Sequence, residues 1–401
     1  MDIPGLPARK AALKLLDAVL RRGETLDQAA QPALQGIRSD ADRALARALA
    51  GEALRWLVDL DALIDSATRQ VLPDDAKPRS ALRLMLAGWL RLDTPPHAVI
   101  ATGLPLLAGG PRRLAHGVFS TLVKREARLP DQPSLPHAVR ERWGDAAPAI
   151  AAGLAVPPPL DLSLHDALTT VEWAERLGGI SLMPGHVRLE RGTAVERLEG
   201  FKDGAWWVQD LAASLPARLL GTGEGQAVLD LCAAPGGKTM QLAAAGWQVT
   251  ALDSGARRLQ RMQDNLARTG LAATLVQADA LQWEPAAPFD AVLLDAPCTA
   301  TGTCRRHPDV LHRIGSRQIA ELAELQDALL ERAQRWVKPG GRLVYATCSL
   351  ERAEGEDQAA SVKLTPDPIR AAELPNGLNP TAEGWLRSDP AMLHEARPRR
   401  V

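Results

Sequence analysis

Five short apolar runs in the second half of the chain constrain its fold more than any other feature. Each has four or five residues, and they cover residues 227–231, 248–252, 274–277, 291–294 and 342–346. Helical patterns separate most of them; the longest begins after the capping residue Ser316 and ends at Pro339-Gly340-Gly341. Alternating β and α segments of this kind predict an open parallel sheet that binds ligands at the carboxyl ends of its strands.

The first half of the chain has a different pattern. Residues 1 to about 130 carry helical stripes almost throughout, which predicts an all-α domain. Prolines at 130, 133, 136, 148 and 157–159 then favour a linker or the entrance to a further domain. Short alternating runs at 160–164 and 186–189 around a helix at 168–177 predict a small α+β connector. We therefore expect three parts: residues 1–130, 131–205 and 206–401.

Composition narrows the class of protein. A chain of 401 residues with net charge −1 and 24% charged residues is typical of a globular protein with two or three domains. It has no apolar run of eighteen residues and no signal-peptide pattern, so we expect a cytoplasmic protein that does not bind membranes. The four cysteines form no CxxC pair, which argues against a metal site.

The segment CAAPGGKT follows the first apolar run and opens a helix. Its adjacent glycines allow close approach of a ligand to the backbone, and the helix start offers unpaired N–H groups. It is not a phosphate-binding P-loop, because Cys232 occupies the position where that motif needs glycine. Asp253 ends the next run, where doubly wound folds place an acceptor for a ribose diol, so we expect a nucleoside cofactor. Asp279 either reaches the adenine or is a surface turn residue.

Two cysteines follow the last two strands of the predicted sheet. Cys298 comes after Asp295-Ala-Pro and Cys348 after Ala-Thr. Since neighbouring strand ends lie about 5 Å apart, both thiols can flank one substrate. A lone cysteine is usually buried and inert, but a pair beside the same cofactor loop favours chemistry. The following loop carries Arg305, Arg306 and His307, which suits an anionic substrate.

A thiol pair of this kind suits methylation of cytosine. Carbon 5 of cytosine attacks a methyl donor poorly until a thiolate adds to carbon 6, and a second group must then help to remove the carbon 5 proton and release the enzyme. Asp295 can hydrogen-bond the base edge as charge moves onto the ring. The base must be unstacked to reach such a pocket, which favours RNA loops and single strands.

Three motifs in this chain resemble one known family. DLCAAPGGKT, LDAPCTATG followed by RRHPD, and ATCS are similar to motifs of the RsmB (Sun/Fmu) family of bacterial small-subunit rRNA cytosine-5 methyltransferases. The resemblance covers nearly the whole chain. It implies an all-α NusB-like amino-terminal domain, a small α+β RNA-binding connector, and an α/β Rossmann-like methyltransferase domain. We expect a monomer whose partner is 16S rRNA.

The resemblance also implies residue roles. It makes Cys348 the nucleophile and Cys298 the residue that assists release, whereas DNA cytosine-5 methyltransferases use the Pro-Cys cysteine for attack. The residues implied to contact S-adenosylmethionine are Cys232, Ala233, Ala234, Pro235, Gly236, Gly237, Lys238, Asp253, Asp279 and Asp295. Two alternatives stay open: a cytosine-5 methyltransferase for tRNA or large-subunit rRNA, and a non-catalytic RNA-binding assembly protein.

The chain departs from the family at two places. The connector of the family begins with an Arg-Val-Asn-like segment, and here the corresponding residues are Leu-Asp-Leu-Ser-Leu-His-Asp. The family ends in a strand with Asp-Gly-Phe-Phe, and here the last residues are LHEARPRRV. We therefore expect an altered RNA contact in the connector and an altered or missing last hairpin.

Overall fold

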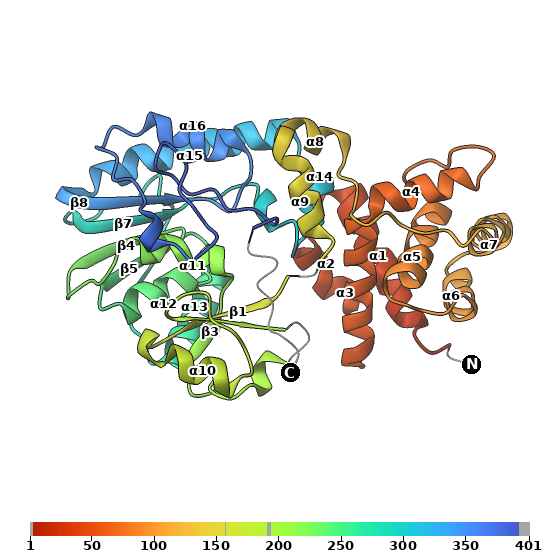
Figure 1. Cartoon of the computed structure of the whole chain (residues 1–401), viewed down its shortest axis with the longest axis horizontal. Helices are drawn as coiled ribbons and strands as arrows, with labels where there is room; N and C mark the ends of the chain where they lie inside the picture. The colour runs from red at the N-terminus through yellow and green to blue at the C-terminus, as the bar shows by residue number, and fades with distance from the viewer. Residues whose placement is uncertain (1–2, 157, 191–193, 393–401) are drawn as a thin grey trace. The chain divides into compact units, whose positions relative to one another are not determined.

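The chain folds into two compact units in a computed structural model that describes residues 3–156, 158–190 and 194–392 (Figure 1). The helical unit comprises the described residues through Val156 together with Thr303–Gly315. The sheet unit comprises the other described residues.

Helices fill the first part of the helical unit, as the periodicity predicts. They are α1 (Leu6–Arg22), α2 (Leu26–Leu34), α3 (Asp40–Arg55), α4 (Leu57–Ser66), α5 (Lys77–Arg91), α6 (Pro96–Gly103) and α7 (Gly109–Lys124). Local signals set their starts: the Thr25 hydroxyl accepts from Gln28 N at 3.1 Å, and the Gln28 side chain accepts from Thr25 N. Leu16, Leu86 and Phe119 are fully buried in the shared core.

The proline-rich stretch differs from the linker that its composition favours. It contains α8 (His137–Trp143) and α9 (Ala147–Leu154), which belong to the helical unit. Pro136 is the residue before α8 and Pro148 lies in the first turn of α9. Proline is favoured at helix starts because the N–H that it lacks has no helical partner there. The division into domains at residues 130 and 205 stays a prediction.

A segment from late in the sequence completes the helical unit. Residues Thr303–Gly315, which include RRHPD and the short helix α14 (Val310–Arg313), pack with the amino-terminal helices. The Arg55 guanidinium donates to the carbonyl oxygens of Leu154 at 3.3 Å and of Arg305 at 3.0 Å. His312 Nε2 lies 2.6 Å from the carbonyl oxygen of Leu54. A buried arginine thus joins parts of the chain that are 250 positions apart.

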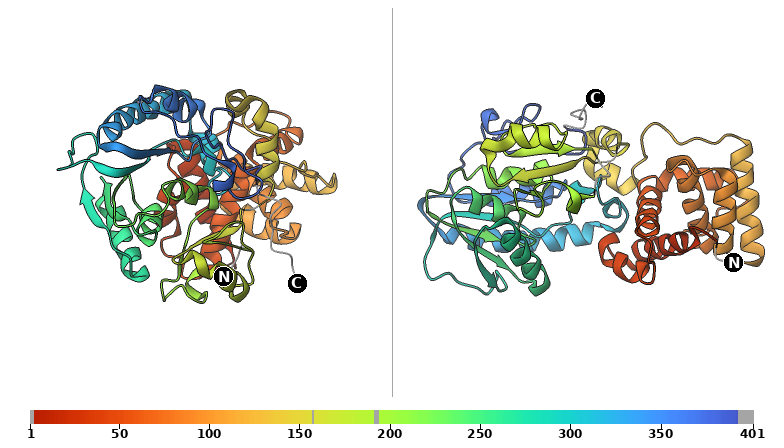
Figure 2. Two further views of the ribbon diagram at one scale, coloured as in Figure 1. Left: turned by 60° about the vertical axis from the view of Figure 1, so that its left-hand side comes forward. Right: turned by 90° about the horizontal axis from the view of Figure 1, so that it is seen from below.

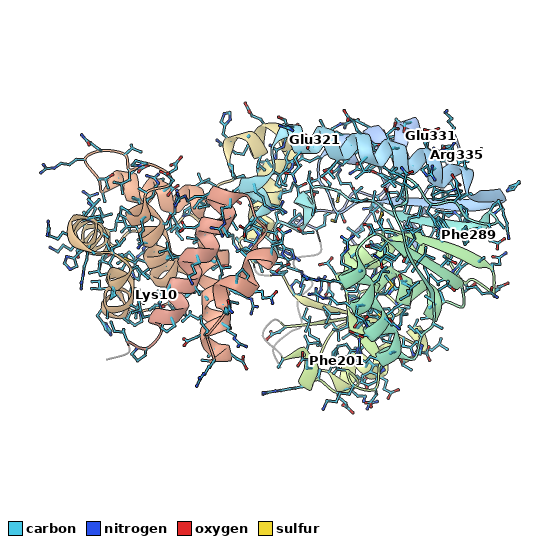
Figure 3. All side chains as sticks on the ribbon, turned by 180° about the vertical axis from the view of Figure 1, so that it is seen from behind. Lys10, Phe201, Phe289, Glu321, Glu331 and Arg335 are labelled. Carbon is cyan, nitrogen blue, oxygen red and sulfur yellow. The ribbon has the colours of Figure 1, made fainter. Side chains whose placement is uncertain are left out.

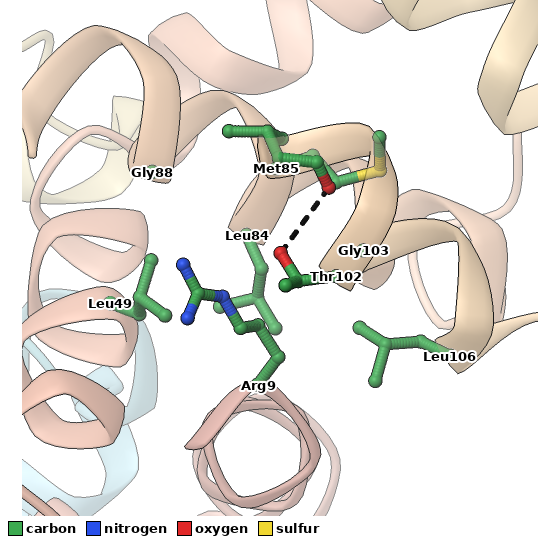
Figure 4. Close-up of a pocket in the computed structure, with 9 residues that line it drawn as sticks. Arg9, Leu49, Leu84, Met85, Gly88, Thr102, Gly103 and Leu106 are labelled. Carbon is green, nitrogen blue, oxygen red and sulfur yellow. Dashed lines mark hydrogen bonds between the residues drawn. The ribbon is translucent and has the colours of Figure 1, made fainter. Parts of the chain in front are cut away.

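The helical unit also contains a small void, lined by Arg9, Leu84, Met85 and Thr102 (Figure 4). Its volume is about 10 Å³, which is about the space of a single water molecule. It is too small for an organic ligand. Among the described residues of the chain, none of the helices is both long and apolar enough to cross a bilayer.

A small antiparallel sheet opens the sheet unit. Its strands β1 (Leu160–Leu164), β2 (His186–Leu189) and β3 (Trp206–Val208) lie in the order β2-β1-β3, with α10 (Thr170–Arg176) between the first two in sequence. Asp161 in β1 is buried and accepts from Arg188 Nε of β2 at 2.7 Å. The bonds to His186 and Arg188 keep the pKa of Asp161 well below its usual value despite burial. A buried ion pair therefore ties the first two strands together.

The main sheet has five parallel strands in the part of the chain that the structure describes, in the order β6-β5-β4-β7-β8. They are β4 (Ala227–Leu231), β5 (Gln248–Asp253), β6 (Thr274–Gln277), β7 (Phe289–Asp295) and β8 (Val337–Ala346). All five predicted strands are present. The last is longer than predicted, since Val337 already pairs with Phe289 and Pro339-Gly340 lies in an irregular part of the pairing.

Helices cover both faces of this sheet (Figures 1 and 2). The helices α11 (Leu211–Arg218), α12 (Gly237–Ala244) and α13 (Ala256–Thr269) lie on one face, and α15 (Ser316–Arg335) and α16 (Glu356–Ser361) lie on the other. Alternate residues of β4 enter the two cores: Val228 packs with Met240, and Leu229 packs with the cluster of Leu329. The charged residues Glu321, Glu331 and Arg335 lie on α15 (Figure 3). This confirms the predicted architecture, in which an α/β region follows an all-α region in the sequence.

The carboxyl end of the described chain contains no further strand. From Val362 to Met392 the structure shows turns, the 3₁₀ turn η7 (Ala371–Glu373) and irregular segments. The segment LHEARPRRV, for which the sequence predicts an altered last hairpin, lies outside the described residues.

Candidate functional site

The strand order identifies the edge of the sheet where a ligand would bind. The chain moves outward from β4 through β5 to β6 and then returns to the other side of β4 as β7. Open α/β sheets bind ligands beyond the carboxyl ends of the strands at such a reversal. The loops that follow β4 and β7 meet at this point, and they carry the glycine motif and the DAPC motif.

The loop after β4 has a backbone that depends on glycine. Gly236 has φ +100°, and a Cβ at this position would lie 2.6 Å from Met262 Cγ of α13. Cys232 at the start of the loop also has positive φ, at 59°. Helix α12 begins at Gly237, directly after the loop. The loop therefore passes close to α13 and brings the start of α12 to the strand ends.

Asp253, at the end of β5, forms a hydrogen bond with the loop after β4. It is 3% exposed, and its carboxylate accepts from Ala234 N at 3.2 Å and from Gly255 N at 2.7 Å. The Arg258 side chain donates to the same carboxylate at 2.7 Å and is itself 57% exposed. Asp253 thus contacts the predicted cofactor loop through Oδ2, and the exposed Arg258 side chain contacts its Oδ1.

Two other acids lie near the same strands. Asp279 follows β6, is exposed, and accepts from Leu281 N at 2.9 Å, as a turn residue does. Asp230, which the sequence reading did not single out, is fully buried inside β4. Its Oδ2 accepts from the Thr239 hydroxyl at 2.6 Å, and burial raises its pKa to about 7. An acid within the apolar run VLDL was the feature of the sequence that could have indicated this buried carboxylate.

Lys238 and Asp295 join the loops after β4 and β7. Lys238 Nζ lies 2.6 Å from Asp295 Oδ2, and both side chains are partly exposed. They line a cavity of about 350 Å³ together with Ala233–Pro235, Phe201, Trp207 and Asp210. This volume lies within the roughly 300–1,000 Å³ typical of small-molecule sites. The cavity adjoins the loop after β4, the end of β7, and residues in and next to β3 of the small sheet.

The two cysteines of the later motifs lie against each other. The Sγ atoms of Cys298 and Cys348 are 3.4 Å apart, and both residues follow paired strand ends, since Asp295 lies opposite Ala346 in the β7–β8 ladder. Cys348 is the more exposed of the two. The pair was predicted from neighbouring parallel strands, and the structure brings it together.

The pKa values of the two thiols are shifted in opposite directions. The hydrogen bond between the sulfur atoms lowers the pKa of Cys348, and nearby Lys238 acts in the same direction. The bond to Cys348, followed by burial, raises the pKa of Cys298. Cys348 is therefore the thiol of this pair that ionises more readily.

The other two cysteines have a different environment. Burial raises the pKa of Cys232 and of Cys304 to about 12, so both stay protonated. Cys304 belongs to the helical unit together with Arg305, Arg306 and His307. The structure therefore groups the predicted basic loop with the helical unit and the thiol pair with the sheet unit.

The backbone of the two cysteine loops is in close contact. Gly302 N donates to the carbonyl oxygen of Cys348 at 2.9 Å. A Cβ on Gly302 would lie 2.8 Å from that oxygen, so the position requires glycine. Side chains that the sequence reading missed, Thr299, Gln326, Ser349 and Glu354, form a buried polar network beneath these loops.

Comparisons with known proteins agree with this arrangement. The model of the 16S rRNA methyltransferase RsmB/F family matches residues 217–375, and that of the NusB family matches residues 6–106. The chain is 36% identical over 383 residues to the ribosomal RNA small subunit methyltransferase B of Xanthomonas campestris pv. campestris, covering 88% of this chain and 87% of the relative. The protein of the same name from Citrobacter koseri is 34% identical over 391 residues, covering 90% and 91%.

A solved structure shares the fold over almost the full length. The crystal structure of PH0851 matches with a TM-score of 0.71 at 22% identity and covers 98% of this chain and 96% of that one. The predicted methyltransferase fold and NusB-like region are thereby confirmed. With relatives above 30% identity along nearly the whole chain, this protein belongs to the RsmB/F family of 16S rRNA methyltransferases.

Proposed function

We propose that this protein methylates carbon 5 of a cytosine in small-subunit (16S) rRNA, with S-adenosylmethionine as methyl donor and a covalent adduct on Cys348. The observation that carries the proposal is the pair of sulfur atoms 3.4 Å apart, of which the more exposed has the lowered pKa. The names of the relatives support rRNA as the substrate.

The residues around the glycine loop fit S-adenosylmethionine. Gly236 lets the backbone run close to α13, the start of α12 presents N–H groups, and the adjoining cavity has the volume of a small-molecule site. We propose that Cys232–Lys238, Asp253, Asp279 and Asp295 contact the cofactor. When bound, it supplies an electrophilic methyl group.

The side chains of the site support a sequence of steps on the cytosine. The Cys348 thiolate adds to carbon 6, the carbon–sulfur bond forms, and the electron pair of the carbon 5–carbon 6 bond becomes available at carbon 5. Asp295, oriented by Lys238 at 2.6 Å, hydrogen-bonds the base edge as the ring charge changes. Carbon 5 forms a bond to the methyl group as the bond between that group and the donor sulfur breaks, with its electron pair staying on the donor, and the carbon 5 proton then passes to solvent water. The electrons of that C–H bond restore the double bond and expel Cys348 as thiolate.

Cys298 has the environment of an assisting thiol. Its pKa is raised and its sulfur atom lies 3.4 Å from that of Cys348, so in its protonated form it can stabilise the Cys348 thiolate before attack and again at release. The reverse assignment, in which Cys298 attacks as in DNA cytosine-5 methyltransferases, would require the less exposed thiol with the raised pKa to ionise first.

Substituting the two cysteines separately tests the mechanism. In Cys348→Ala, methylation and covalent attachment to RNA should both vanish, because no adduct can form. In Cys298→Ala, attack and methyl transfer should still occur and release should stall. The stalled species is a protein–RNA conjugate that survives denaturing electrophoresis and carries label from the cofactor.

The matched control is Cys304→Ala, which removes a buried thiol of the helical unit and should behave as wild type. A conjugate that accumulates in Cys348→Ala would reverse the roles of the two thiols. Bisulfite sequencing of RNA from cells that lack the protein tests the substrate: the lost methylcytosine should lie in 16S rRNA. A loss in tRNA or large-subunit rRNA would overturn the choice of substrate.

A further inference from the structure

The buried carboxylate of Glu354 has no part in the steps above, yet it lies directly beneath the two cysteines. Glu354 ends the 3₁₀ turn η6 (Arg352–Glu354) and is 0% exposed. No lysine, arginine or histidine in the described parts of the chain lies within ion-pair distance of it. Burial of a carboxylate without a cation is costly unless its oxygens accept several hydrogen bonds.

One oxygen of Glu354 holds the loop that carries Cys298. Its Oε1 accepts from the backbone N–H of Thr299 at 2.9 Å and from Gln326 Nε2 at 3.0 Å. The same Gln326 nitrogen donates to the carbonyl oxygen of Pro297 at 2.8 Å. The residues on both sides of Cys298 are therefore held by Glu354, directly at Thr299 and through Gln326 at Pro297.

The other oxygen of Glu354 holds the loop that carries Cys348. Its Oε2 accepts from the hydroxyl of Ser349, the residue after Cys348, at 2.5 Å. It also accepts from the Thr299 hydroxyl, which lies 3.1 Å from the Ser349 hydroxyl. One carboxylate thus joins two loops that are 50 positions apart in the sequence and whose sulfur atoms lie 3.4 Å apart.

We propose that Glu354 is the positioning residue that holds Cys298 and Cys348 in hydrogen-bonding contact and directs ionisation to Cys348. The inference rests on the proposed covalent mechanism. The two N–H partners of Oε1 can only donate, and the two hydroxyls at Oε2 are placed to donate, so the carboxylate accepts from all four. After the bond to Cys348 and burial, the negative charge of Glu354 is a further contribution that keeps the pKa of Cys298 high.

The chemistry of the partners requires a carboxylate at this position. The Thr299 N–H and the Gln326 side-chain N–H face one oxygen, while the two hydroxyls face the other. In Glu354→Gln the new amide nitrogen cannot lie next to the two N–H groups, because all of these groups are donors. It can lie only next to the two hydroxyls, which can rotate and accept a hydrogen bond. That variant keeps the volume of the side chain but loses its charge and its strongest hydrogen bonds.

The test uses the full-length protein without RNA or cofactor, so that its outcome does not depend on the proposed reaction. Alkylation of Cys348 by iodoacetamide is followed against pH by mass spectrometry of its peptide. In Glu354→Gln the apparent pKa of Cys348 should rise toward the roughly 8.5 of free cysteine. Diamide should also form the Cys298–Cys348 disulfide about tenfold more slowly, since the sulfur atoms are no longer held in contact.

A second variant, Ser349→Ala, removes the hydroxyl that links Glu354 to the Cys348 loop, together with the contacts of that hydroxyl to Thr299, Thr301 and Glu351 N. It should change both readouts in the same direction. The control is Asp357→Asn, an acid on α16 with a 59% exposed side chain and an ion pair to Arg352 at 3.8 Å. It should match wild type. In the methylation assay, kcat of Glu354→Gln should fall about tenfold or more, while cofactor affinity by calorimetry stays within about twofold.

Wild-type alkylation and cross-linking profiles in both Glu354→Gln and Ser349→Ala would overturn the proposal, even if kcat fell. A different result separates the two proposals: the thiol profiles change in the Glu354 and Ser349 variants, but Cys348→Ala still methylates RNA. That result would support the role of Glu354 in positioning the thiols and would refute the covalent mechanism. The two ideas therefore fail separately.

Discussion

The buried acid of the central strand predicts a specific dependence of stability on pH. Asp230 is 0% exposed, has one hydrogen bond from Thr239, and its Oδ1 has no partner among the described residues. Burial raises its pKa from 3.8 to about 7. Asp230→Asn keeps the size of the side chain and removes the titration, so the two proteins differ mainly in this proton.

The sign of the effect follows from the raised pKa. Below pH 3.8 both the folded and the unfolded chain carry the proton, and the acid contributes no pH dependence. Between pH 3.8 and about 7 only the unfolded chain releases it, so rising pH favours unfolding. Above about pH 7 Asp230 also ionises in the folded protein, and the free energy of unfolding falls no further on its account. At about 1.4 kcal/mol per pH unit, the full loss is about 4 kcal/mol, of which about 3 kcal/mol falls between pH 5 and 8.

Urea unfolding at pH 5, 6, 7 and 8 measures this loss. Tryptophan fluorescence is a suitable probe because most of the ten tryptophans lie in the sheet unit. The unfolding free energy of wild type should fall by about 3 kcal/mol more than that of Asp230→Asn between pH 5 and 8. The control Asp264→Asn, an exposed acid on α13, should follow wild type. Parallel curves for wild type and Asp230→Asn would refute the raised pKa.

Two further predictions concern ligands. Asp253→Ala should weaken S-adenosylmethionine binding about ten- to a hundredfold through loss of charge-assisted hydrogen bonds. Its control, Arg258→Ala, should bind the cofactor at least as well as wild type. An unchanged calorimetric affinity in Asp253→Ala would show that Asp253 does not contact the cofactor. Arg112 and Arg113 are exposed in the first turn of α7, and replacing each with glutamine should reduce the salt dependence of RNA binding by about one unit. Slopes equal to wild type would exclude phosphate contacts at these two positions.

Local patterns in the sequence were sufficient to predict the architecture. The runs at 227–231 and 274–277 coincide with β4 and β6. β4 is a buried central strand, which needs only a few successive apolar residues between turns, and β6 is the partly exposed strand at the end of the strand order. The meeting of Cys298 and Cys348 was also predictable, since residues after neighbouring parallel strands emerge at the same edge. The motifs themselves identified the family.

Local patterns were misleading where a residue has two uses. Proline marks both linkers and helix starts, so the stretch with Pro136 and Pro148 suggested a linker and forms α8 and α9. The sequence also suggested that the basic loop beside the DAPC motif suits an anionic substrate, and this stays a prediction. The structure groups its residues from Thr303 onward with the helical unit, where Arg55 binds Arg305 O.

The tertiary structure alone shows which side chains bond to the loops that carry the two cysteines. Glu354 lies outside the three motifs that singled out the cysteines, and nothing in its immediate sequence shows that it is fully buried or that it accepts from Thr299, 55 positions away. The same holds for the proton between Cys298 and Cys348, because pKa values depend on burial and on charges that folding brings together. Periodicity and motifs are properties of neighbouring residues, and they determined the fold and the family. Hydrogen bonds between distant residues shift the pKa values of the two thiols in opposite directions, and those contacts exist only in the folded chain.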